Sequence, residues 1–356
     1  MTKDQYGERL VVDAGNLFCP RNLPTDDQRE AFEDKARLFV NAYRKQKCDA
    51  LGFGGSDLAA LGTDFARLLE KDAGFPFITT NIVDADGKTF FKPDVIVERA
   101  GVKFGFLSLA DPATPLPAGL TVRPPVEAAM EAIATLKKQG AEVIVVLSNL
   151  GKPDLDKVLA EVEGIDFALG DKQMSMPRFV ESQGNTLLAA AGQKGKHVNL
   201  LTLNVSDLSK RPFVVRDMGK KFVKELQQLD SRLKRYERLV NSPAQPGTRA
   251  ANPERYKGII DRQLEERKAL LEKVKGLQQV SKDAPFVLFE SAPMNKQRKE
   301  DPEVQGWVQA HLKKYPKRAP ARPKGAAANR LKRPTTVPGS AVNIRTIPTP
   351  PTGTHP

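Results

Sequence analysis

The stretch ALGFGGSDLAALGTDF, residues 50–65, decides the fold. A short apolar run ends in a cluster of glycines, and a helical pattern begins at Ser56 or Asp57. This order predicts a buried strand, a tight turn and a helix from about Asp57 to Glu70. Strand-to-helix turns are where α/β proteins place their ligands. The turn therefore holds a metal ion, an anion on its backbone N–H groups, or nothing beyond its own chain.

The rest of the first 209 residues continues the alternation of short β-rich runs and amphipathic stretches. The run VIVVL at 143–147 is apolar throughout, which is typical of a strand covered on both faces. Residues 94–110 predict a β-hairpin that turns at 98–101. The runs NTLLAAAG and HVNLLTLNVS, at 185–192 and 197–206, predict two closing strands paired antiparallel. We therefore expect one α/β domain with mixed sheets flanked by helices over residues 1–209.

Residues 210–282 have a different pattern. One face of the first helical stretch has apolar residues at spacings of 4, 3, 4, 3 and 4, which is a coiled-coil seam: Phe222, Leu226, Leu229, Leu233, Tyr236 and Val240. A loop with three prolines follows, and a second helix carries Ile260, Leu264, Leu271 and Val274 on one face. The prolines favour an antiparallel hairpin within the chain. The alternative is that the seam pairs with another protomer.

Residues 283–315 predict a strand and a short helix with Asp301 at its N-cap and Pro302 at its first position. Residues 316–356 are rich in Pro, Ala and Thr, and this composition predicts a disordered tail. The tail contains eight basic residues and no acidic one, so it supplies a large part of the chain's net charge of +13. The basic residues expected to contact a polyanion or a partner are Lys317, Arg318, Arg322, Lys324, Arg330, Lys332 and Arg333.

The positive charge of the tail indicates that it binds an acidic partner protein or an anionic envelope polymer or lipid. Sequence-specific nucleic-acid binding is not expected, because no aromatic residue follows Tyr315 to stack on bases. The alternative is a solvated, non-specific linker. The sequence also has no apolar run near the roughly 20 residues that span a bilayer, no signal-peptide pattern, and only two cysteines, Cys19 and Cys48.

Several segments together resemble the metallophosphatase domain of the 5'-nucleotidase family. VVDAGNLF at 11–18 resembles the family's "DAGDLF" turn, and residues 48–87 resemble the segment with its "GNHE" motif. VIVVLSNLGKPD at 143–154 is similar to its "SHLG" strand, and AAAGQKGKHVNLLTLNV at 189–205 to its closing segment. The resemblance runs in order from about Leu10 to Val205. It implies a layered metallophosphatase-like sandwich, and a typical place in the cell envelope, although this chain shows no export signal.

The resemblance also implies two divalent metal ions that activate a water and clamp a phosphoryl oxygen. Most of the ligands are replaced in this sequence, and the family's opening Asp-x-His strand has no counterpart, so we expect the start to be internal to a longer product. The positions that match the family's ligand motifs are Asn16, Ser56, Asp57, Asn149, Asp171 and Lys172, next to Asp13. None of the three histidines, at 197, 311 and 355, falls among these turns.

Two functions follow from these replacements. In the first, the chain is a non-catalytic relative that needs no metal cofactor and binds a protein partner through its hairpin or tail. In the second, it is a divergent phosphoesterase with a rebuilt site that is metal-free or in which Asp13, Asn16, Asp57, Asn149 and Asp171 hold a single hard cation. These residues are alternatively ordinary cap and turn residues with no ligand.

Overall fold

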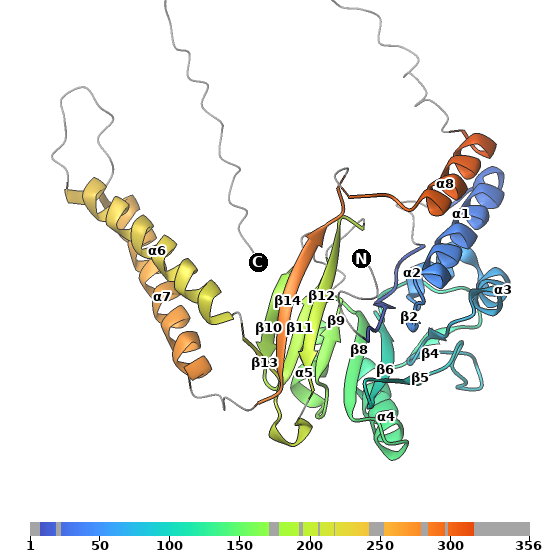
Figure 1. Cartoon of the computed structure of the whole chain (residues 1–356), viewed down its shortest axis with the longest axis horizontal. Helices are drawn as coiled ribbons and strands as arrows, with labels where there is room; N and C mark the ends of the chain where they lie inside the picture. Colours follow the sequence, from blue (N-terminus) through green and yellow to red (C-terminus); the bar gives the residue numbers. More distant parts are fainter. Residues whose placement is uncertain are drawn as a thin grey trace, which may run out of the picture. The chain divides into compact units, whose positions relative to one another are not determined.

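A computed structural model describes residues 8–18, 23–170, 178–191, 195–205, 207–216, 218–241, 253–278, 284–295 and 298–316 (Figure 1). Apart from residue 316, the described residues all belong to one compact unit, Met1–Tyr315. The predicted tail, with its seven basic contact residues, lies outside the described residues, as do Cys19, Asp171 and Lys172.

The largest sheet has six strands in the order β10-β11-β9-β8-β6-β5. Its inner strands are parallel to one another, and the edge strands β5 and β10 are antiparallel to their neighbours. The strands are β5 (Asp94–Arg99), β6 (Val102–Ala110), β8 (Val143–Asn149), β9 (Phe167–Leu169), β10 (Arg178–Gln183) and β11 (Thr186–Ala190).

Three smaller sheets complete the β-structure of the described residues. One is parallel, with β1 (Val12–Asp13), β2 (Ala50–Gly52) and β3 (Phe77–Ile78). The second has the order β12-β14-β13, with β12 (His197–Asn204), β14 (Phe286–Pro293) and β13 (Val214–Val215). The third pairs β4 (Ile82–Val83) with β7 (Thr121–Val122). A 3₁₀ turn, Leu208–Lys210, follows β12.

The described helices fall into three groups. Near the N-terminus are α1 (Asp26–Lys45), α2 (Gly55–Leu61) and α3 (Thr63–Ala73), while α4 (Pro125–Lys138) and α5 (Lys152–Glu161) follow β7 and β8. The remaining three are α6 (Met218–Asn241), α7 (Pro253–Gln278) and α8 (Pro302–Lys314). None of the helices within the described ranges combines the length and apolarity needed to cross a membrane.

The six-stranded sheet is covered on both faces, as the continuous apolar run of β8 predicts. Val143, Val145 and Leu147 pack in a cluster with residues of β1, β12 and β14. Ile144 and Val146 point to the other face and pack with α4 and α5. The sheets β1-β2-β3 and β12-β14-β13 therefore lie on one face of the large sheet and helices on the other, which confirms the expected mixed sandwich.

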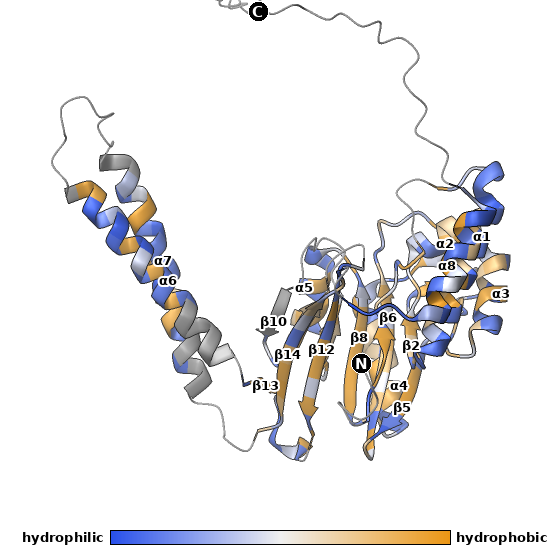
Figure 2. Ribbon diagram, turned by 45° about the horizontal axis from the view of Figure 1, so that its top comes forward, coloured by the Kyte–Doolittle hydropathy of each residue, from blue (hydrophilic) through white to orange (hydrophobic). Residues whose placement is uncertain are grey.

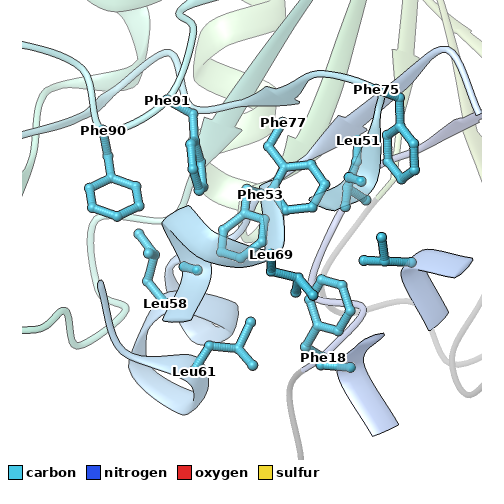
Figure 3. Packing of buried hydrophobic residues seen from close by; sticks show 14 of the residues in the cluster. Phe18, Leu51, Phe53, Leu58, Leu61, Leu69, Phe75, Phe77, Phe90 and Phe91 are labelled. Atoms are coloured by element: carbon cyan, nitrogen blue, oxygen red, sulfur yellow. The ribbon is translucent and has the colours of Figure 1, made fainter. Parts of the chain in front are cut away.

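A third cluster joins α1, α2 and α3 to β2 and β3 and is rich in phenylalanine (Figure 3). The ring of Phe53 stacks on that of Phe77 at 5.1 Å between centroids, and Phe91 meets both rings edge-on at 5.1 and 5.4 Å. Phe53 belongs to the quoted glycine stretch, so burial of its side chain fixes the turn against the helices.

Four sequence expectations need correction. The helix expected from Asp57 to Glu70 is two helices, because Gly62 has a φ of 75° and breaks it. The hairpin turns at Ala100 and Gly101 alone, since the expected turn residues Glu98 and Arg99 still pair with β6. The closing strands β11 and β12 belong to different sheets: β11 pairs with β9 and β10, whereas β12 pairs with β14.

The fourth correction concerns α7. In the structure α6 and α7 pack antiparallel, since Asp230 binds Arg267 at 2.7 Å and the rings of Tyr236 and Tyr256 lie 5.9 Å apart. The predicted contact face is wrong at its centre: Gln263 is buried, whereas Leu264 is 47% exposed. On α6 the predicted seam residues Leu229 and Leu233 are buried, and the Phe222 side chain lies outside the described set. The Val274 side chain lies outside the described set.

Candidate functional site

The turns after β1, β2 and β8 bring four of the predicted site residues together. Asp13 ends β1, Asp57 lies in the first turn of α2, and Asn149 ends β8. The side-chain oxygens of Asn16 and Asn149 both approach Gly54, at 2.2 and 3.3 Å from the position that a Cβ would take there. The convergence that the resemblance implies is therefore present for Asp13, Asn16, Asp57 and Asn149.

Asp57 is fully buried and binds backbone with both carboxylate oxygens. Its Oδ1 accepts the N–H of Phe18 at 2.8 Å, and its Oδ2 accepts the N–H of Gly54 at 3.2 Å. The backbone N–H of Asn16 also donates to this carboxylate. Burial raises the pKa of Asp57 to about 7, and these three donors oppose the shift only in part. Asp57 therefore ties the loop after β1 to the start of α2.

Asp13 likewise accepts hydrogen bonds with both of its carboxylate oxygens. Its Oδ1 accepts the N–H of Gly15 at 2.7 Å, and its Oδ2 accepts the hydroxyl of Tyr43 at 2.6 Å. Burial raises the pKa of Asp13 and, together with the neighbouring Asp13 charge, raises the pKa of Tyr43 above its ordinary value. The Tyr43 contact was missed from the sequence, because Tyr43 lies on α1, 30 positions from Asp13, and not in one of the turns.

Asn149 and Asn16 close the space between the turns. The Asn149 amide Nδ2 donates to the backbone carbonyl of Ala14. Asn16 has a left-handed backbone with a φ of 53°, and its Oδ1 is buried without a hydrogen-bond partner among the described groups. A buried amide oxygen without a partner is costly, so Asn16 is the least satisfied residue of the site.

The glycines of the quoted stretch are explained by protein contacts. A Cβ at Gly52 would lie 2.7 Å from Ser108 Oγ, and one at Gly55 would lie 2.9 Å from a Thr114 methyl carbon. At Gly54 the obstacle is Asn16 Oδ1. Close packing thus explains Gly52, Gly54 and Gly55, whereas Gly62 has nothing within 4 Å of its Cβ position and is explained by its φ of 75°. Ser56, between these glycines and Asp57, is half-buried.

His197 and His311, the histidines among the described residues, lie elsewhere, and His355 is outside the described ranges. His197 begins β12, where it pairs with Pro293. His311 is on α8, and its Nδ1 lies 2.7 Å from Asp34 Oδ2 on α1. Within the described ranges no three or more His, Cys, Asp or Glu side chains are grouped so as to hold a metal ion.

Over part of its length the chain is similar to a curated nucleotide phosphoesterase, in line with the sequence resemblance. The curated neighbour is the trifunctional nucleotide phosphoesterase protein YfkN of Bacillus subtilis, 26% identical over 169 residues. The match covers 42% of this chain and 12% of that protein, so the chain corresponds to a small part of its relative.

Solved structures with a similar fold include the calcineurin-like phosphoesterase YfkN from Bacillus subtilis, with 19% identity and a TM-score of 0.49 over 58% of this chain and 74% of that chain. Another is a 5'-nucleotidase precursor from Thermus thermophilus, with 22% identity and a TM-score of 0.46 over 56% of this chain and 43% of that chain. No protein-family model matches the sequence.

The residues of this site do not fit the pair of divalent ions that such a fold implies. A dinuclear centre needs carboxylate and imidazole ligands that converge on shared space. Here the oxygens of Asp13 and Asp57 already accept protein hydrogen bonds, and Asn149 directs its amide N–H at a backbone carbonyl. The space between them is filled by Asn16 against Gly54.

Proposed function

We propose that this chain is a non-catalytic protein built on a phosphoesterase fold, which acts as a binding or scaffold component through the α6–α7 hairpin and the basic segment 316–356. The observation that carries the proposal is that the carboxylates of the site are used in hydrogen bonds to the backbone and to Tyr43. Asp57 binds three backbone N–H groups, and Asp13 binds Tyr43 and Gly15. A catalytic centre instead keeps ligands free to bind metal and substrate.

The proposal is tested by catalysis and by metal binding. We expect no hydrolysis of nucleoside monophosphates or bis-p-nitrophenyl phosphate, with or without added Mn²⁺, Zn²⁺ or Mg²⁺. Isothermal titration with each ion should show no site in the micromolar range. Metal-dependent turnover that is lost in Asp57→Asn and Asn149→Ala, but kept in the exposed variant Asp64→Asn, would overturn the proposal.

A second candidate function is a phosphoesterase with a rebuilt site for one hard cation. The observation that favours it is the unpaired, buried Oδ1 of Asn16, with the Asn149 oxygen nearby. Oxygen ligands of this kind suit Mg²⁺ or Ca²⁺. If one cation binds there, Mg²⁺ or Ca²⁺ should raise the melting temperature of the wild type and leave that of Asn16→Ala unchanged.

The basic segment is the proposed contact for an anionic envelope component or an acidic protein. Binding that rests on counterion release falls steeply as salt rises and needs no folded tail. Deleting residues 317–356 should abolish retention on anionic vesicles at low salt and leave thermal unfolding of the remainder nearly unchanged. Retention that is independent of salt would mean that the prolines, and not the charges, are recognised.

A further inference from the structure

The α7 helix carries more apolar surface than α6 covers. Ile260, Leu264, Arg267 and Leu271 follow one another at spacings of 4, 3 and 4, so they form a stripe along one side of α7. Leu264, at the middle of this stripe, is 47% exposed, and Ile260 and Leu271 are only half-buried. The alternation of apolar and polar residues along both helices is visible in Figure 2.

The contact with α6 is made mainly by a neighbouring stripe. Gln263 is buried, the Tyr256 ring meets Tyr236, and Arg267 at the border of the two stripes binds Asp230 at 2.7 Å. Among the described side chains of the hairpin, the only apolar ones that reach full burial are two leucines of α6, at 229 and 233. A pair of helices with so small a buried core gains stability when another apolar surface covers the exposed stripe.

The charges beside the stripe are self-complementary. Lys257, Asp261, Lys268 and Glu272 are all exposed on α7 and alternate in sign, and Glu272 also binds Lys275 of its own helix at 2.8 Å. They are arranged symmetrically about a point between Leu264 and the next residue, so that Lys257 mirrors Glu272 and Asp261 mirrors Lys268. Two copies of α7 that cross antiparallel at this point would place opposite charges next to each other on both sides of the crossing point. Charges that flank the contact between paired helices interact in the same way.

We propose that the α7 stripe is a contact for a second copy of this chain, with α7 packed antiparallel on α7 of the partner about a two-fold axis beside Leu264. An axis of this kind requires a surface that complements itself, which the mirrored charges provide. Leu264 packs on its own symmetry mate, and Ile260 packs toward Leu271 of the other copy. This inference deepens the proposed function, because it names one partner of the hairpin.

The first test is the mass of the full-length chain in solution, measured by sedimentation velocity over a wide range of concentrations. We expect a monomer–dimer equilibrium. Leu264→Asp should weaken the dimer at least about 100-fold, since it places a charge in the centre of an apolar contact. Leu239→Asp is the matched control: Leu239 is a 39% exposed leucine on α6 outside the stripe, and its replacement should leave the dimer unchanged.

The second test reverses the charges. Asp261→Lys and Lys268→Asp should each weaken self-association, because each places like charges opposite one another. The double variant should restore it, and a mixture of the two single variants should form the mixed dimer. All these positions are exposed, so circular dichroism should show folded protein in every case.

Three outcomes would overturn the inference: a wild type that stays monomeric at every concentration, a failure of the double variant to recover, or equal effects of Leu264→Asp and Leu239→Asp. None of these outcomes bears on the metal and hydrolysis assays. The failure of this inference is therefore distinguishable from the failure of the proposed function.

Discussion

The Asp57 carboxylate accepts the backbone N–H of Phe18, 39 positions earlier in the chain, at 2.8 Å. This bond joins the loop after β1 to the start of α2, and it satisfies a buried N–H that otherwise has to find water. Burial of the Asp57 carboxylate raises its pKa.

A first prediction concerns pH. Burial raises the pKa of Asp57 from 3.8 to about 7, so the folded protein binds this proton more tightly than the unfolded chain does. The free energy of unfolding should therefore be highest below pH 4 as far as this group is concerned, and fall by up to about 4 kcal/mol as pH rises from 4 to 7. Urea titrations across this range should show the fall.

The variant Asp57→Asn should remove most of that slope, because an amide does not titrate. Asp13, whose pKa burial also raises, leaves a residual slope of the same sign. Asp64→Asn, at an exposed position of α3, is the control and should reproduce the wild-type profile. A wild-type stability that does not change between pH 4 and 7 would show that Asp57 ionises normally.

A second prediction concerns the packing of Asn16 on Gly54. In Gly54→Ala the new methyl group would lie 2.2 Å from Asn16 Oδ1, so a side chain or the turn must shift. We expect a loss of about 1–3 kcal/mol in unfolding free energy. Adding Asn16→Gly should recover most of it, since this change removes the obstacle and suits the left-handed backbone at 53°.

The matched control is Gly258→Ala on α7, where a Cβ would meet nothing within 4 Å. It should stabilise the hairpin by about 0.5–1 kcal/mol through helix propensity. If Gly54→Ala is as well tolerated as Gly258→Ala, then the turn is open enough to admit a ligand.

A third prediction concerns α8, whose side chains are all at least partly exposed. It is held on α1 by polar contacts: Lys45 binds Asp301 and Glu303, both at 2.6 Å, and His311 lies beside Asp34. Exposed ion pairs of this kind contribute little each and weaken with salt. Lys45→Ala should speed amide exchange in α8 and leave α1 protected, with little change in the overall free energy of unfolding. Equal loss of protection in both helices would show that α8 belongs to the main core.

The sequence predicted the layered fold because its signals are local. The apolar run of β8 and the glycine turn after β2 follow from spacing alone, and Asp301 caps α8 as its position before Pro302 predicts. The pairing of β12 with β14 could not be predicted, because the whole hairpin separates the two strands in the sequence. Neither strand has a sequence feature that identifies the strand with which it pairs. The register of distant strands is decided by the tertiary core.

The site, like the fold, could be predicted from the sequence only in part. Spacing and resemblance placed Asp13, Asn16, Asp57 and Asn149 around one point, and the structure brings them together there. The sequence did not indicate which groups these side chains bind. An Asp at a turn gives the same sequence signal whether it binds a metal, a hydroxyl such as that of Tyr43, or a backbone N–H. That difference depends on the direction of each side chain.

The last prediction separates the hairpin from the sandwich. Leu229 is 1% exposed in the seam between α6 and α7, so Leu229→Asp buries a charge there and should cost about 3 kcal/mol or more. Because the described core clusters of the sandwich are built from other elements, the loss should be local. Hydrogen exchange should show protection lost in α6 and α7 but kept in β6 and β8. The control Leu239→Asp, on the exposed side of α6, should leave the protection of both the hairpin and the sheet unchanged. Loss of protection throughout β6 and β8 in the Leu229 variant would mean that the hairpin folds as one unit with the sheet.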